Sequence, residues 1–360
     1  MQYLSVGITR EDLAEPPGSA PASLIAPALH GLLYYASLAP SGHNAQPWTV
    51  RPDGRDIWVG TDSARWLPKV DPANREVMLS VGAFLENLIT AAPAHGFVAD
   101  YEVAAAQAAT DVVRVVLKST APHDAPLERL RERRTTRSGQ LARDISTADV
   151  QALRAAAGND EMLFFAAGSP HGRQLAEATL EANRLQTARD DAQSELADWM
   201  RWTREDGRAH RNGFTPESLD ITGIAGWYVR HFMNKKAVLG KRFRKQSLDL
   251  VRRQLASYGG WIVITSKDES VPALIDAGRC CERMWLDARS RSIAVHPMSQ
   301  VLEEAPLKDQ IAGDLGMPGR VQFVLRIGYV TAYPRPVSLR MPVSWFLRNG
   351  EGSWQTTQRI

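Results

Sequence analysis

Apolar residues recur along the chain with two periods, which predict long helices and short strands. Helical spacing covers residues 24–39, 74–95, 172–202 and 271–290, and Ser146 followed by Asp149 is a capping signal for a further helix over 147–157. Two short strands flank the turn at residues 52–54, and the β-branched run 111–118 predicts a buried strand. Further strand patterns lie at residues 161–167, 259–266 and 320–330, the last as a central strand. We therefore expect an α+β fold.

Breaks in these patterns divide the chain. A Pro/Gly/Ser-rich stretch closes an N-terminal arm at 1–22, and the prolines at 122 and 126 separate a first lobe, 23–122, from a second, 123–360. The second lobe contains a candidate lid at 204–227, which bears glycines and aromatic residues without sustained periodicity, and a proline-spaced arm at 331–360. Each lobe has a long helix followed by a strand. This weak echo favours an internal pseudo-dimer, although any α+β protein can show such a pair.

Composition narrows the class of protein. Hydrophobic residues make up 44% and charged residues 23% of the 360 positions, as in globular proteins. The 43 Lys and Arg against 40 Asp and Glu give a net charge of +3, without the concentrated charge of a nucleic-acid binder. The N-terminus lacks the features of a signal peptide, and we find no uninterrupted apolar run of about 18 residues. We expect a soluble, cytoplasmic protein without a nucleic-acid or membrane partner.

The sequence lacks the motifs of several common kinds of functional site. The two cysteines, Cys280 and Cys281, are adjacent, so a disulfide between them would be strained and they have no metal-site spacing. No GxGxxG opening a helix after a strand, P-loop, HExxH or GxSxG motif occurs in the sequence. We therefore expect no metal site, no classical dinucleotide fold and no hydrolase triad.

The loop PSGHNAQPW, at residues 40–48, is the densest group of polar side chains. Ser41, His43, Asn44 and Gln46 follow the helix that Pro40 ends. A flavin edge presents one N–H donor and several acceptors, for which amide side chains are suitable partners. The alternative is an Asx-type turn before a strand.

A second cluster consists of Arg133, Arg134, Thr135, Thr136 and Arg137. A phosphate monoester needs charge-assisted donors, which guanidinium groups and a threonine hydroxyl supply. A solvated helical face, partly neutralised by neighbouring glutamates, is the structural alternative. A nucleic-acid patch is a third, but aromatic residues do not interleave with these arginines.

PSGHNAQPW resembles the PSxxNxQPW signature of the nitroreductase superfamily, and the chain is similar along most of its length to the Acg-type group within it. The resemblance implies two fused nitroreductase-like halves: a mixed, mostly antiparallel sheet flanked by helices, with two pseudo-equivalent lobes that mimic a nitroreductase dimer. It also implies one FMN at their junction, with the PSGHNAQPW loop against the flavin ring.

The resemblance assigns further residues to the cofactor. The arginine cluster resembles the RxSxR element that holds the FMN phosphate, so Arg133, Thr135 in place of serine, and Arg137 carry that role, with Arg134 beside them. A Gly-Tyr step at 328–329 followed by a basic residue points to Arg340, with Arg335 as the alternative. The loop after the core helix resembles one whose backbone N–H approaches flavin N5, which singles out Pro297, Met298 and Ser299. We interpret His296 as an ordinary loop histidine and assign no catalytic side chain.

The implied function is that of an FMN-dependent oxidoreductase. NAD(P)H would reduce the flavin, and an electron-poor small molecule, such as a nitro or quinone compound, would reoxidise it. The alternative is a protein that stores or sequesters FMN beneath the 204–227 lid, with little turnover. We expect either a monomer, as a pseudo-dimer, or a homodimer.

Overall fold

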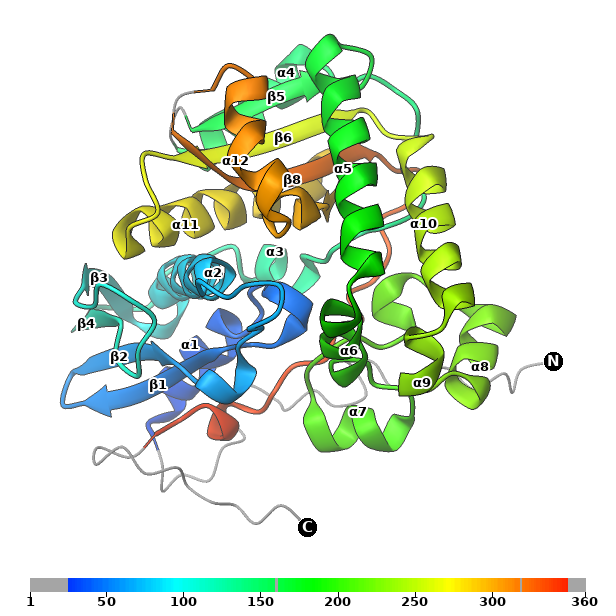
Figure 1. Cartoon of the computed structure of the whole chain (residues 1–360). Helices are drawn as coiled ribbons and strands as arrows, with labels where there is room; N and C mark the ends of the chain where they lie inside the picture. The colour runs from blue at the N-terminus through cyan, green and yellow to red at the C-terminus, as the bar shows by residue number, and fades with distance from the viewer. Residues whose placement is uncertain (1–24, 159–160, 318, 349–360) are drawn as a thin grey trace.

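The computed structural model describes residues 25–158, 161–317 and 319–348, and within them the strands form two antiparallel sheets (Figure 1). The first sheet contains β1 (Trp48–Asp53), β2 (Asp56–Thr61), β3 (Phe97–Val103) and β4 (Val113–Ser119), in the order β1-β2-β4-β3. The second contains β5 (Met162–Ala166), β6 (Gly260–Ser266), β7 (Ile293–Pro297) and β8 (Arg320–Tyr329), in the order β5-β6-β8-β7. The order of the first sheet is thus repeated in the second.

Two long helices lie between the sheets and join them. Helix α2 (Arg75–Ala91) connects the second and third strands of the first sheet, and α11 (Val271–Ala288) does the same in the second. A Cβ on Gly82 would stand 2.2 Å from the Ile275 carbonyl oxygen, and one on Gly278 would stand 2.1 Å from the Leu79 carbonyl oxygen. Only glycine permits so close a backbone approach. With the repeated sheet order, this reciprocal contact bears out the expected α+β fold with two pseudo-equivalent lobes.

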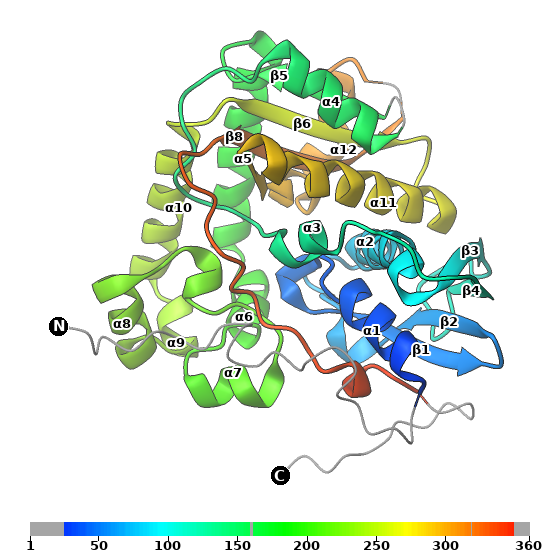
Figure 2. The same cartoon turned by 180° about the vertical axis from the view of Figure 1, so that it is seen from behind.

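The remaining helices cover the sheets and extend one side of the molecule. Helices α5 and α10 run from the second sheet down to the group α6 to α9, as Figures 1 and 2 both show. The helices are α1 (Pro27–Ala36), α3 (Leu127–Glu132), α4 (Thr147–Ala157), α5 (Pro170–Ala188), α6 (Asp190–Asp198), α7 (Arg204–His210), α8 (Gly223–Phe232), α9 (Lys235–Val238), α10 (Lys241–Leu255) and α12 (Ala305–Asp314). Ser146 caps α4 by accepting a hydrogen bond from the Asp149 N–H, as the sequence predicts.

The described part of the C-terminal arm returns to the first sheet. Leu347 forms a parallel bridge with Val50, and Phe346 is fully buried against Phe84, which also contacts Trp48. The arm therefore ties the end of the chain to the first lobe. The expected N-terminal arm at 1–22 and residues 349–360 lie outside the described residues.

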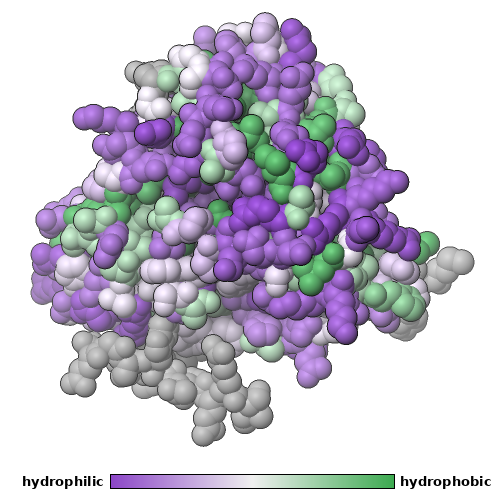
Figure 3. Space-filling model, in the orientation of Figure 1, coloured by the Kyte–Doolittle hydropathy of each residue, from purple (hydrophilic) through white to green (hydrophobic). Residues whose placement is uncertain are grey.

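The apolar residues are mostly internal. The helical stretch Arg75–His95 is long and apolar enough to cross a membrane by length and composition, but 78% of its most apolar window is buried within the fold. The face shown in Figure 3 is mostly hydrophilic, with hydrophobic atoms gathered in small separate patches. Most of the apolar surface is thus used in packing.

Two expectations about individual elements are wrong. The helix expected over 172–202 is two helices, because the backbone of Arg189 is extended (φ −81°, ψ 119°) and α6 begins anew at Asp190. The strand expected to be buried over 111–118 begins at Val113 and alternates, with Arg114 and Lys118 exposed, because only one face of its sheet is covered. The 204–227 segment holds α7 and the start of α8, although its sequence lacks a sustained period.

Other elements did not stand out in the sequence. Strands β3 and β7 and helix α10 were not expected. The residues of β3 do alternate between exposed and half-buried positions, whereas β7 is short and buried on both faces, so its pattern has no period.

Candidate functional site

The loop after α1 has a strained backbone. His43, Asn44 and Gln46 have φ values of 49°, 53° and 54°, in the left-handed region that costs a non-glycine residue about 1–2 kcal/mol. The Ser41 hydroxyl accepts a hydrogen bond of 2.9 Å from the Gln46 N–H and helps to hold this conformation. Such strain gathers at functional sites, where the surrounding structure imposes it.

Two amide side chains of this loop bind other segments of the protein. The Gln46 amide donates to the Arg211 carbonyl (3.0 Å) and accepts from the Met341 N–H (3.0 Å). Asn44 donates to the carbonyls of Gly213 and Leu339, both at 3.1 Å. Gln46 lines neither of the cavities described below, and its direct contact with a flavin stays a prediction. Gln46 joins the candidate lid and the C-terminal arm to the loop.

The Arg133 guanidinium is buried and already has partners within the protein. Its guanidinium donates to the Leu38 carbonyl (2.6 Å), forms an ion pair with Glu282 (3.1 Å) and stacks over the Trp285 ring. Both charged side chains are almost completely buried. Burial raises the pKa of Glu282 to about 7, against the opposing effect of Arg133. Arg133 therefore connects Leu38, just before the PSGHNAQPW loop, to Glu282 on α11.

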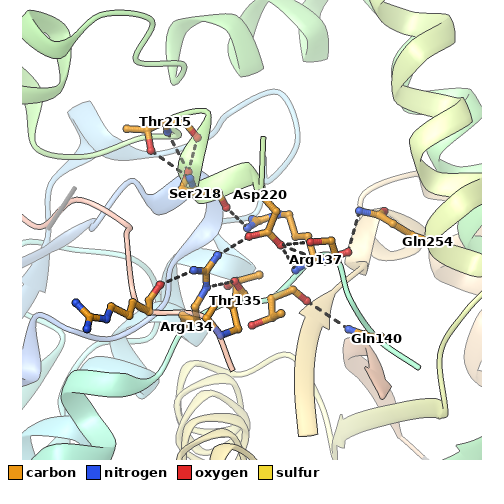
Figure 4. Close-up of polar contacts among 12 residues, drawn as sticks. Arg134, Thr135, Arg137, Gln140, Thr215, Ser218, Asp220 and Gln254 are labelled. Atoms are coloured by element: carbon orange, nitrogen blue, oxygen red, sulfur yellow. Dashed lines mark hydrogen bonds and ion pairs between the residues drawn. The ribbon is translucent and has the colours of Figure 1, made fainter. Parts of the chain in front are cut away.

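Arg134 and Arg137 hold the candidate lid through Asp220 (Figure 4). The Asp220 carboxylate pairs with the Arg134 guanidinium and accepts from the backbone N–H groups of Arg137 (2.7 Å) and Ser138 (3.0 Å). The Arg137 guanidinium donates to the Ser218 carbonyl (2.6 Å). Burial lowers the pKa of Arg137 to about 10, so it stays charged at neutral pH.

Arg340 and Arg335, the two arginines considered for the phosphate, have different environments in the structure. Arg340 is 9% exposed and donates to the Asn44 side-chain oxygen (2.9 Å) and to the Leu38 carbonyl (2.9 Å). Arg335 is exposed, and its carbonyl accepts a hydrogen bond from Arg134. Only Arg340 of the two lines a cavity, which favours it as the phosphate ligand.

These side chains surround a small basic pocket. Its volume is about 40 Å³, room for about three water molecules. Its walls carry guanidinium, hydroxyl and amide groups from several segments. They are formed by Pro40, Ser41, Asn44, Arg133, Arg134, Thr135, Arg137, Phe214, Ser218, Pro336, Ser338 and Arg340.

A larger, more apolar cavity adjoins this pocket. Its volume is about 1030 Å³, and the two share Pro40, Ser41, Thr135, Arg137 and Phe214. His43 and the three predicted residues at 297–299 also line it. The Met298 N–H donates to the Val324 carbonyl (2.9 Å), so Ser299 is the better candidate for a backbone donor to a ligand.

The two histidines of this cavity are neutral. Burial lowers the pKa of His43 to about 4, and burial with the charge of Arg326 lowers that of His296 well below its usual range. His296 lies on strand β7 and is 7% exposed, so its interpretation as a loop histidine is wrong. Neither histidine adds positive charge to the cavity at neutral pH.

The sequence did not single out several residues of the site. Asp220, Ser338, Glu76 and Glu303 are single polar residues without a motif around them. Glu76 alone had a local signal, because it lies at the start of the helical pattern over residues 74–95. In the structure its carboxylate would stand 2.7 Å from a Cβ on Gly42. The position of the others depends on contacts between distant segments.

Comparisons with known proteins point to one family. Residues 130–329, more than half of the chain, match the model of the nitroreductase family. A Serratia sp. protein with the provisional name NAD(P)H nitroreductase PigM is 26% identical over 319 residues, 84% of this chain and 88% of its own length. A Mycobacterium tuberculosis protein with the provisional name NAD(P)H nitroreductase Acg is 24% identical over 331 residues, covering 86% and 91% of the two chains.

Proposed function

The chain belongs to the nitroreductase family of oxidoreductases, and we propose that it binds FMN and uses NAD(P)H to reduce an electron-poor small molecule. The observation that carries this proposal is the pair of adjoining cavities. One is small and basic, and the other is large and mainly apolar. FMN has the same two parts, a doubly charged phosphate and a flat ring system.

The donor set fits the phosphate end. Arg137 and Arg340 bring guanidinium groups to the small pocket, and Ser41 and Thr135 line it with them. Charge-assisted bonds from such groups are the strong ones in phosphate recognition. Arg133 is already paired with Glu282. It would therefore contribute positive electrostatic potential rather than a direct hydrogen bond to the phosphate.

The ring end is formed by both halves of the chain. His43 comes from the first half and Ser299 from the second, and both line the large cavity. FMN, when bound, supplies the two-electron chemistry of the reaction. The chain's own part is to orient the ring, to exclude water and to offer backbone donors at its edge.

The purified protein provides a direct test. We expect a flavin absorbance spectrum that bleaches when NAD(P)H is added anaerobically and returns when menadione is added. A colourless protein that does not take up added FMN would contradict the cofactor. Bound flavin that neither NADH nor NADPH reduces would contradict the oxidoreductase.

The second candidate function is FMN sequestration, and the tethered 204–227 segment favours it. Gln46, Asn44 and Asp220 fasten residues 211–220 of that segment over the cavities. A segment held this firmly would protect the ring from donors and acceptors. Stopped-flow reduction separates the two functions, because a sequestering protein would keep its flavin oxidised with NAD(P)H and react slowly with dithionite.

A further inference from the structure

Two carboxyl groups meet on the wall of the large cavity, one from each half of the chain. Glu76 begins α2 and packs against Gly42 of the PSGHNAQPW loop. Glu303 directly follows the short helix Ser299–Leu302, whose first residue is the candidate backbone donor. The two side chains are hydrogen-bonded to each other, and both line the cavity. The pair thus lies between the two loops expected to hold the flavin ring.

Two carboxyl groups in hydrogen-bond contact share a proton, because two neighbouring negative charges repel each other. Burial raises the pKa of Glu76 to about 7, with Arg75 opposing and Asp71 and Glu195 adding to the rise. Burial and the charge of Glu76 raise the pKa of Glu303 as well. Near neutral pH the pair therefore holds a proton that it can release.

A separate observation indicates that this cavity meets a ligand. The Gln193 side chain is 3% exposed, lines the same cavity, and its oxygen has no hydrogen-bond partner among the described residues. A buried polar atom without a partner is unfavourable unless a ligand or water satisfies it. A polar group of a molecule bound in the cavity would provide that partner.

Four other titratable groups of the cavity do not supply a proton at neutral pH. His43 and His296 are neutral, as described above. Burial raises the pKa of the Cys281 thiol well above its usual range. Arg137 retains its proton too firmly to release it.

We propose that the Glu76–Glu303 pair is the acid that protonates the electron acceptor during its reduction, an inference that rests on the proposed function. A quinone acceptor gains a hydride equivalent, derived from NAD(P)H, and one proton, and becomes a hydroquinone. The carboxyl O–H bond breaks while an O–H bond to the acceptor oxygen forms. The resulting carboxylate is stabilised by Arg75, 3.2 Å from Glu76. Glu76 is 18% exposed, so it can regain a proton from water in the cavity.

The first test compares two oxidants of the reduced holoprotein. Menadione needs protons, whereas ferricyanide accepts electrons alone. For Glu76→Gln and Glu303→Gln we expect reoxidation by menadione to slow by about 10²–10⁴-fold, the usual range for general acid catalysis, and reoxidation by ferricyanide to stay unchanged. Glu303→Asp should restore much of the rate. The control is Glu181→Gln, which removes an exposed carboxylate that pairs with Arg184 and lines neither cavity.

The second test uses the apoprotein, so that it does not depend on turnover. The folded pKa of Glu76 lies above its ordinary value of 4.5, so the pair's contribution to stability is present below about pH 4.5 and is lost as pH rises to about 7. The difference in melting temperature between parent and Glu303→Gln should change across this window. The infrared band of a protonated carboxyl should be weaker at neutral pH in Glu303→Gln than in the parent, because only the contribution of Glu282 is common to both proteins.

The outcomes separate this inference from the proposed function. Parental menadione rates in both glutamine variants, with parental flavin content and NAD(P)H reduction, would overturn the acid role and leave the oxidoreductase intact. Equal slowing with menadione and ferricyanide would also overturn it, because it would indicate a structural effect. A parent protein without bound flavin would instead contradict the proposed function.

Discussion

Removing the Asp220 carboxylate should release the candidate lid from the arginine motif. Asp220 pairs with Arg134 and accepts two backbone hydrogen bonds, from Arg137 at 2.7 Å and Ser138 at 3.0 Å. Hydrogen bonds to a charged group contribute about 1.5–3 kcal/mol each, so losing two of them costs about 3 kcal/mol at the lower end. That energy corresponds to about a 10²-fold larger population of the locally open state.

Amide hydrogen exchange measures this opening directly, because the Arg137 and Ser138 N–H groups are the donors. In Asp220→Ala we expect both amides to exchange about 10²-fold faster, and in Asp220→Asn less so, since the amide keeps one acceptor oxygen. Arg134 keeps the carbonyls of Thr135 and Arg335 as partners, which limits global destabilisation. If the segment covers the flavin, dithionite should also reduce the holoprotein faster.

The control is Asp100→Asn, which removes an exposed ion pair with Lys118 far from the site and should change neither rate. Unchanged protection of the Arg137 and Ser138 amides in Asp220→Ala would refute the role of Asp220 in holding the candidate lid closed. Faster exchange with an unchanged dithionite rate would show that the segment opens but does not shield the ring.

Four further results are expected. Acid-released FMN should approach one equivalent per chain, and a ratio near two would contradict a single junction site. Arg137→Ala should weaken FMN binding by about 1.5–3 kcal/mol in equilibrium titration, with riboflavin a poor ligand of the parent; unchanged affinity would argue against the phosphate role. Gly82→Ala should lower the melting temperature markedly, because its Cβ would stand 2.2 Å from the Ile275 carbonyl oxygen. The pKa of His43 falls from 6.5 to about 4 on folding, so stability should decline as pH drops through that window, by less in His43→Gln.

The sequence by itself determined the two central helices and the two loops of the site. The 3.6-residue spacing of apolar positions located α2 and α11, because each must bury one face along its whole length. The PSGHNAQPW string and the Arg133 to Arg137 cluster indicated a flavin and a phosphate through their resemblance to nitroreductase motifs, because the residue types alone left an Asx-type turn and a solvated helical face open. Both loops line the observed cavities.

Tertiary structure decided which partner each polar side chain takes. The amide of Gln46 indicated hydrogen bonding, but its partners, Arg211 and Met341, come from segments far along the chain. Asp220 lies 86 residues from Arg134, and the Glu76–Glu303 contact forms only because two halves pack against each other. Periodicity records whether a residue is buried, since burial repeats with the local backbone, whereas a single long-range polar contact leaves no repeating trace in the sequence.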